Sequence, residues 1–286
     1  MHHLLLATCA AFPDGDADDR ALLGPLAASN VDASFAVWSD PAVDWTAAPT
    51  VLRSTWDYTL RRDAFLTWVD TVPKVHNPAD VVRWSSDKVY LAELRRAGLP
   101  VTPTLVVTPG ARAELPDEEF VVKPSVGAGS RGAGRFVPAA GDAAHAHVAA
   151  LHEAGRTVLV QPYLAGVDEA GETALIYLAG EFSHAVRKGP MLTSDTVHDI
   201  SETSGLFVEE NISARRPDAA ELAVGNRALA FLRDRFGAAP LYARVDLLPG
   251  PDGPVVVELE LVEPSLFLAH ADGAVERFAA LLAALA

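Results

Sequence analysis

Apolar and polar positions alternate in short blocks over the first part of the chain. The apolar run at residues 4–8 stops short of Pro13-Asp14-Gly15 and predicts a buried strand; a signal-peptide core is the alternative, but no Lys or Arg precedes the run. Residues 18–29 carry apolar positions near helical spacing. Strands that alternate with helices predict an α/β layer. The other elements expected here are strands at 33–38 and 50–52 and helices at 61–72 and 85–97.

Strands separated by glycine-containing turns dominate from about residue 101 onward. Residues 173–178 and 182–188 flank Ala179-Gly180-Glu181 and predict a hairpin. The polar stretch at residues 189–216 has little periodicity, and segments of that length are usually functional lids or disordered, so we expect a lid there. The remaining expected elements are strands at 119–123, 135–137, 158–163, 242–248 and 254–262 and helices at 142–154, 218–236 and 272–285.

Bulk composition narrows the class of protein. The chain has 286 residues, of which 50% are hydrophobic, enough for a sizeable core divided into two or three lobes. A net charge of −15 argues against a nucleic-acid or anionic-membrane partner, because both would repel the average surface. No apolar stretch approaches the roughly 20 residues needed to span a bilayer. The lone cysteine, Cys9, excludes an internal disulfide framework, so a reducing cytoplasm is expected.

A glycine-rich loop, Gly127-Ala128-Gly129-Ser130-Arg131-Gly132, follows a predicted strand. Dinucleotide-binding loops of this pattern lead into a helix, whereas Arg135-Phe136-Val137-Pro138 predicts a second short strand. The loop therefore resembles a flap whose backbone amides cover phosphate oxygens, with Ser130 and Arg131 adding side-chain donors. A hairpin loop without a ligand is the alternative.

Two lysines bear on the choice between a phosphate-binding flap and a hairpin loop without a ligand. Lys123 ends an apolar strand directly before the glycine loop, where a buried ammonium needs an anionic partner. Lys88 lies in a predicted helix and supplies a second cation, although an exposed helical lysine is an equally ordinary interpretation.

Three carboxylates are expected on one face of a late hairpin. Side chains alternate along a strand, so Glu258 and Glu260 share a face, and tight pairing places Asp246 opposite Glu258. Like charges so arranged need a cation between them, and Mg²⁺ takes carboxylate and phosphate oxygens. An acidic face exposed to water is the alternative.

The segment Arg53-Ser54-Thr55-Trp56-Asp57-Tyr58 follows the predicted strand at 50–52. Ligands of open α/β sheets bind outside the carboxyl ends of strands, so Arg53 could clamp a substrate carboxylate. Alternatively, Trp56 and Tyr58 pack between lobes while Arg53 pairs with Asp57.

Taken in order, these features resemble the ATP-grasp superfamily of carboxylate–amine ligases from about residue 88 to 265. Residues 53–58 and 258–267 are similar to those of the glutathione-synthetase-like branch, and in particular to the cycloserine synthetase group, which cyclises O-ureidoserine. The resemblance implies an α/β fold with α+β lobes. Its domains would be an N-terminal substrate-side α/β domain at 1–84, a central ATP-grasp subdomain with the glycine loop at 85–163 and a C-terminal subdomain with the carboxylate hairpin at 164–286.

The resemblance also implies roles for individual residues. Two Mg²⁺ ions would bind Asp246, Glu258 and Glu260, although many members carry Asn in place of Glu260. The residues implied to bind ATP are Lys88, Lys123, Gly129, Ser130, Arg131, Gln161, Tyr163 and Leu164, with Asp168 or Glu172 at the ribose. Arg187 would face the acyl phosphate with Lys188 beside it. The residues implied to bind substrate are Arg53, Ser54, Trp56, Asp57, Arg244, Glu263 and Ser265.

The implied reaction phosphorylates an amino-acid-like carboxylate with ATP and then joins it to nitrogen, either within the molecule or between molecules, releasing ADP and phosphate. His184 and His198 are two of several histidines that would serve as base. A small-molecule kinase and a non-catalytic ATP-binding protein are the alternatives, and a homodimer is an open expectation.

Overall fold

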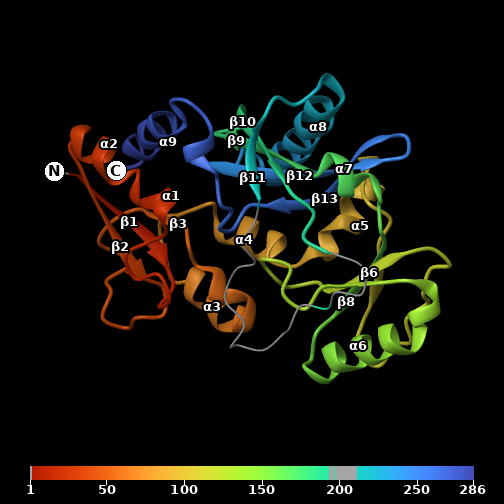
Figure 1. Cartoon of the computed structure of the whole chain (residues 1–286). Coiled ribbons are helices and arrows are strands. Elements are labelled where there is room, and N and C mark those ends of the chain that lie inside the picture. Colours follow the sequence, from red (N-terminus) through yellow and green to blue (C-terminus); the bar gives the residue numbers. More distant parts are fainter. Residues whose placement is uncertain (1, 193–196, 198–210) are drawn as a thin grey trace.

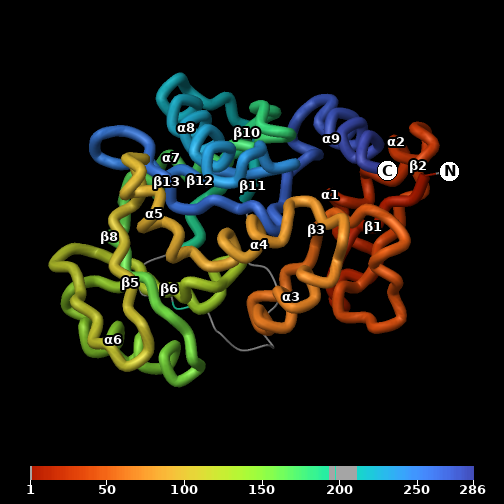
Figure 2. The backbone as a smooth tube through the Cα atoms, turned by 180° about the vertical axis from the view of Figure 1, so that it is seen from behind, coloured from red at the N-terminus to blue at the C-terminus, as the bar shows by residue number. Residues whose placement is uncertain are grey.

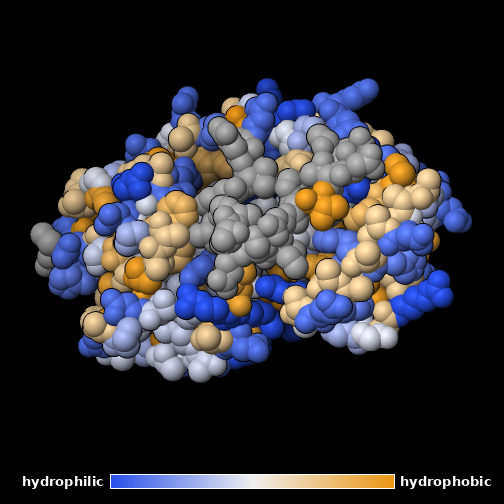
Figure 3. Space-filling model, turned by 60° about the horizontal axis from the view of Figure 1, so that its bottom comes forward, coloured by the Kyte–Doolittle hydropathy of each residue, from blue (hydrophilic) through white to orange (hydrophobic). Residues whose placement is uncertain are grey.

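The computed structural model describes residues 2–192, 197 and 211–286. Its strands form three sheets, which occupy successive parts of the chain (Figure 1). Among the described helices, none combines the length and apolarity needed to cross a membrane. Hydrophilic and hydrophobic residues are interspersed over the visible described part of the face in Figure 3.

The first sheet is parallel, with strand order β2-β1-β3-β4. The predicted strand at 4–8 is confirmed, and Leu4 and Leu6 are fully buried in it. The predicted helix at 18–29 is instead two short helices, because Pro25 can donate no backbone hydrogen bond and is tolerated only in a first turn. The elements are β1 (His2–Thr8), α1 (Ala17–Arg20), α2 (Leu23–Ala28), β2 (Val31–Val37), β3 (Thr50–Leu52), η1 (Trp56–Leu60), α3 (Arg62–Val69) and β4 (Val75–His76).

Short helices connect this sheet to the second. The predicted helix at 85–97 is wrong in extent, because Asp87 caps a new 3-10 turn that interrupts it. The elements are α4 (Ala79–Ser85), η2 (Lys88–Tyr90) and α5 (Leu91–Arg96). The Tyr90 hydroxyl donates to the Leu259 carbonyl over 2.9 Å and accepts from the Leu259 amide over 2.7 Å. These bonds fix Lys88 beside the last strand of the third sheet.

The second sheet is antiparallel, in the order β5-β8-β6-β7. The expected strand–loop–strand around the glycine loop is confirmed as the β6–β7 hairpin. Val148 and Leu151 of α6 pack in one apolar cluster with Phe120 and Phe136 of the sheet. The elements are β5 (Leu105–Val107), β6 (Phe120–Pro124), β7 (Gly134–Phe136), η3 (Pro138–Ala140), α6 (Gly141–Glu153), β8 (Val158–Pro162) and α7 (Gly166–Ala170).

The third sheet has the order β11-β10-β9-β12-β13. Helix α8 packs against it, whereas α9 returns to lie beside α2 of the first part, as Figures 1 and 2 show. Phe278 of α9 shares one buried cluster with Leu4 and Tyr242 and so joins the first and third sheets. The elements are β9 (Glu172–Leu178), β10 (Glu181–Lys188), β11 (Ile212–Arg215), α8 (Ala219–Phe236), β12 (Tyr242–Gly250), β13 (Gly253–Glu260), η4 (Leu268–His270) and α9 (Ala274–Ala283).

Strand β11 lies within the stretch expected to be irregular, where Ser213 pairs with Arg187 of β10. Most of the expected lid, and with it His198, lies outside the described residues.

Candidate active site

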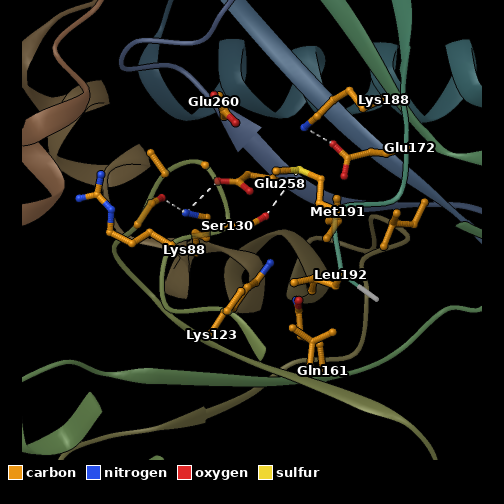
Figure 4. A pocket seen from close by; sticks show the side chains of 18 of the residues that line it. Lys88, Lys123, Ser130, Gln161, Glu172, Lys188, Met191, Leu192, Glu258 and Glu260 are labelled. Carbon is orange, nitrogen blue, oxygen red and sulfur yellow. Dashed lines mark hydrogen bonds and ion pairs between the residues drawn. The ribbon is translucent and has the colours of Figure 1, made fainter. Parts of the chain in front are cut away.

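A cavity lies between the second and third sheets (Figure 4). Trp56 and Tyr58 of η1 and Lys88 of η2 also line it. Its walls bring together residues that lie far apart in the sequence. The predicted site residues that line it are Trp56, Lys88, Lys123, Gly129, Ser130, Arg131, Gln161, Tyr163, Leu164, Glu172, Lys188, Arg244, Glu258, Glu260, Glu263 and Ser265.

Lys88 is held at one end of the cavity. Its ammonium lies 2.8 Å from Glu258 Oε1 and donates to the Gly127 carbonyl over 2.5 Å. Burial alone would lower the pKa of Lys88, but the Glu258 carboxylate raises it above its ordinary value. Lys88 is therefore a permanent cation under the glycine loop, and the interpretation as an exposed helical lysine is wrong.

Lys123 projects toward the same space from β6 (Figure 4). Burial lowers the pKa of Lys123, and the positive charge of Lys88 lowers it further. No acceptor or carboxylate of the described chain pairs with its ammonium. An anion that entered here would meet two cations beneath the flap that carries Gly129 and Ser130, both of which have positive φ angles (58° and 56°).

The predicted register of the carboxylate hairpin is confirmed. Asp246 pairs with Glu258 across β12 and β13, and Arg244 pairs with Glu260. The cations between these carboxylates come from the protein: the Arg244 guanidinium contacts Glu260 and lies 2.8 Å from Asp246 Oδ2, which Lys188 Nζ also approaches to 3.2 Å.

The carboxylates differ strongly in proton affinity. Burial opposes ionisation of Asp246, but Arg244 and Lys188 hold the pKa of its carboxyl well below its usual range. The pKa of Glu258 is likewise lowered by Lys88 and Lys123 against the effect of burial. Burial raises the pKa of Glu260 to about 8, with Arg244 opposing it only in part. Of these three carboxylates, Glu260 is therefore the one whose ionised form an additional cation would stabilise most.

The donor set fits Mg²⁺ that is shared with phosphate. Glu258 and Glu260 offer hard oxygen ligands to the cavity, opposite Lys88 and Lys123. No cluster of three metal-ligating side chains stands ready-made in the described chain. Asp246 is 1% exposed, pairs with Arg244 and Lys188, and does not line the cavity, so the expectation of three carboxylates on the cavity needs correction.

The far end of the cavity is formed by the end of β8. Gln161 donates from Nε2 to Thr104 Oγ1 over 2.8 Å, and the Arg135 guanidinium lies 3.5 Å from the ring centre of Tyr163. Asp168 accepts from the Tyr163 hydroxyl and does not line the cavity. Of the two residues expected at the ribose, the structure therefore leaves Glu172. The sequence pattern missed the apolar walls, which are Val121, Met191, Leu192, Leu248 and Val257.

Arg187 does not face the cavity. Its Nε donates to the Ala170 carbonyl over 2.8 Å and its Nη2 to the Glu169 carbonyl over 3.1 Å, at the end of α7. Successive side chains of a strand take opposite faces, and it is Lys188 that points inward. The position expected for Arg187 is thus wrong, and the guanidinium on the cavity belongs to Arg244.

The position expected for Arg53 is also wrong. Its guanidinium is buried, lies 2.6 Å from Asp19 Oδ1 and donates to the Pro264 carbonyl over 3.1 Å. Neither the substrate clamp nor the Arg53–Asp57 pair is present.

The neighbours of Arg53 have separate roles in the structure. Asp57 pairs with Arg61, and Ser54 hydrogen-bonds Thr8, so neither lines the cavity. Trp56 and Tyr58 do line it.

His184 has a structural environment. Its Nε2 donates to the Leu266 carbonyl over 2.8 Å, and burial lowers its pKa. It does not reach the cavity, which contradicts a role as base.

Comparison with known proteins decides the family. Residues 4–80 match the family model described as the N-terminal domain of D-cycloserine synthetase DcsG. The chain is 39% identical over 301 residues to the cycloserine biosynthesis protein DcsG of Streptomyces lavendulae, covering 99% of this chain and 98% of that protein. The chain belongs to the D-cycloserine synthetase family.

Solved structures agree with this assignment. The crystal structure of D-cycloserine synthetase DcsG superposes with a TM-score of 0.88 at 37% identity and covers 99% of each chain. D-alanine–D-alanine ligase from Bacillus anthracis, solved in complex with ATP, gives a TM-score of 0.62 at 13% identity over 100% of this chain and 97% of that chain, which shows the shared ATP-grasp fold. The D-cycloserine synthetase family consists of ATP-grasp enzymes, and this chain is an ATP-dependent carboxylate–amine ligase.

Proposed function

We propose that the enzyme phosphorylates the carboxylate of O-ureidoserine with ATP and closes the ring through the substrate's own N–O nitrogen, which displaces phosphate. ADP and phosphate are released, and hydrolysis removes the carbamoyl group of that nitrogen as carbon dioxide and ammonia, which leaves cycloserine. The observation that carries this substrate is the 39% identity to the Streptomyces lavendulae cycloserine biosynthesis protein, which extends over 99% of the chain. The cavity supports the same chemistry, because cations and hard oxygen ligands surround a space that apolar side chains close at its far end.

The phosphate groups of ATP would lie between Lys88 and Lys123, with the loop amides and Ser130 covering them. Glu258 and Glu260 would hold Mg²⁺, which offsets negative charge on the phosphates; we propose two ions. Gln161 and Leu164 would border the adenine, and Glu172 the ribose.

Arg244 would stabilise the acyl phosphate. Its guanidinium lines the cavity beside Glu260, and its Nη1 donates to the Ser265 carbonyl over 3.1 Å, which fixes its direction. A positioned guanidinium offsets charge that develops on the phosphoryl oxygens as the carboxylate attacks. Met191 and Leu192 reduce the access of water to an intermediate that water would hydrolyse.

The test is product analysis with MgATP and O-ureidoserine. The proposal predicts ADP, phosphate and cycloserine, formed together and only when substrate is present. AMP with pyrophosphate would exclude an acyl phosphate, and accumulation of a stable phosphorylated substrate would favour the kinase alternative.

The domain limits, the cellular location and the oligomeric state are also proposals. The domain limits at 84/85 and 163/164 fall between the three sheets. We place the reaction in the cytoplasm, where ATP is available, and retain the homodimer as an expectation that light scattering tests.

A further inference from the structure

Glu263 is a buried carboxylate on the cavity wall. It follows β13 and retains 6% of its accessible surface.

Glu263 differs from the other carboxylates that line this cavity. Glu172 pairs with Lys188, Glu258 with Lys88 and Glu260 with Arg244. Within the described part of the chain, no cation lies at ion-pair distance from Glu263; its carboxyl accepts a hydrogen bond from its own backbone N–H, and the charges of Lys88 and Arg244 act on it from farther away. Burial raises the pKa of this carboxyl to about 8, so its ionised form is disfavoured until a ligand brings a cation beside it.

The surroundings of Glu263 indicate what kind of cation would pair with its carboxylate. Its backbone carbonyl accepts from Trp56 Nε1 over 3.2 Å, which places it at the N-terminal side of the cavity. Tyr58, two residues after Trp56 in η1, also lines the cavity; burial raises the pKa of its hydroxyl well above its usual value, and the charge of Glu263 raises it further. A carboxylate beside two aromatic residues suits an organic ammonium better than a hydrated metal ion.

Glu263 is also close to the group that would hold the reacting carboxylate. Only Pro264 separates it from Ser265, whose carbonyl binds the Arg244 guanidinium. Arg244 and Glu263 both line the cavity, the charge of Arg244 acts on the Glu263 carboxyl, and the α-carbons of residues 263 and 265 are at most about 7 Å apart. An α-amino acid carries its carboxylate and ammonium on one carbon and matches such a pair.

From this arrangement we infer that Glu263 binds the α-ammonium of the substrate and makes the enzyme selective for α-amino acids. This role deepens the proposed function and rests on it. The ammonium supplies the missing partner of Glu263 and, by the same contact, presents the adjacent carboxylate to Arg244.

The experiment measures kcat/KM for ADP release with two substrates and three proteins. The substrates are O-ureidoserine and 3-(ureidooxy)propanoic acid, which lacks the amino group. The proteins are the wild type, Glu263→Gln and the control Glu153→Gln, which alters an exposed carboxylate of α6. Thermal unfolding verifies that Glu263→Gln is folded.

For the wild type, loss of the amino group is expected to lower kcat/KM about 100-fold, as when one partner of a desolvated charge pair is removed. With O-ureidoserine, the kcat/KM of Glu263→Gln is expected to be lower than that of the wild type by about the same factor. With the second substrate, the kcat/KM of Glu263→Gln should be close to that of the wild type. The KM for ATP should not change. Glu153→Gln should match the wild type with both.

Equal further losses with both substrates in Glu263→Gln, or equal wild-type kcat/KM for both, would overturn this inference alone. A wild type that releases no ADP with O-ureidoserine would overturn the proposed function and this inference with it.

Discussion

The Lys88 ammonium lies 2.8 Å from Glu258 Oε1 and so joins the start of the central region to the last strand of the third sheet. The contact places a cation that we propose to bind phosphate directly against a carboxylate that we propose to bind metal. Each group keeps the other ionised, since the carboxylate raises the pKa of Lys88 while Lys88 helps to lower that of Glu258.

ATP binding should depend on Lys123 and on magnesium. Lys123→Ala removes a half-buried lysine from the end of the cavity where we propose that the phosphates bind, and it should weaken the calorimetric Kd for MgATP about 10- to 100-fold, the range for a charge-assisted contact. The exposed Lys74→Ala serves as control. Glu258→Ala should reduce the gain in affinity that Mg²⁺ provides; an unchanged Mg²⁺ dependence would contradict its place in the metal site.

Substitution of Arg244 should affect catalysis, whereas substitution of Arg187 should affect stability. Arg244→Gln removes the guanidinium on the cavity and should lower kcat for ADP release at least about 100-fold, the usual cost of losing one positioned donor to a developing charge. Arg187→Gln loses two carbonyl contacts at the end of α7 and should lower the free energy of unfolding by about 1 kcal/mol with kcat unchanged. The opposite pattern would restore Arg187 to the site.

Arg53 should matter for stability. Arg53→Met leaves Asp19 buried without its partner, a change that typically costs about 3–5 kcal/mol, and urea unfolding should show it. Burial raises the pKa of Asp19 to about 7, with Arg53 opposing. In Arg53→Met/Asp19→Asn much of the loss should be recovered, and a double variant no more stable than Arg53→Met would argue against the pair.

Stability should fall as pH rises toward neutrality. Burial raises the pKa of Glu263 to about 8 from an ordinary 4.5, so between these values the folded state holds a proton that the unfolded state has lost. Stability from this group is complete below about pH 4.5 and is lost up to about pH 8, at about 1.4 kcal/mol per pH unit. Urea unfolding at pH 5.5, 6.5 and 7.5 should show a shallower fall for Glu263→Gln; identical slopes would refute the assignment.

Period-two alternation made the carboxylate hairpin predictable, because it fixes which side chains of β13 share a face once the turn is located. The same rule separates Arg187 from Lys188, which point to opposite faces, but which of the two faces inward depends on α7, and that helix was not foreseen. The break in the first predicted helix was foreseeable from Pro25.

Contacts between residues far apart in the sequence could not be predicted from local sequence patterns. Nothing near Arg53 in the sequence indicates that its carboxylate partner is Asp19, and local spacing cannot show that Tyr90 bonds the backbone of Leu259. These contacts depend on how α1 packs beside the end of β3 and how η2 packs against β13, which is tertiary information.

The proposed mechanism depends on an acyl phosphate, and an isotope-transfer measurement can detect its formation. O-Ureidoserine labelled with ¹⁸O in its carboxylate is turned over with MgATP, and the released phosphate is analysed by mass spectrometry. We expect one ¹⁸O in each phosphate formed, because the substrate oxygen leaves with the phosphoryl group. Unlabelled phosphate, or label in AMP, would contradict it.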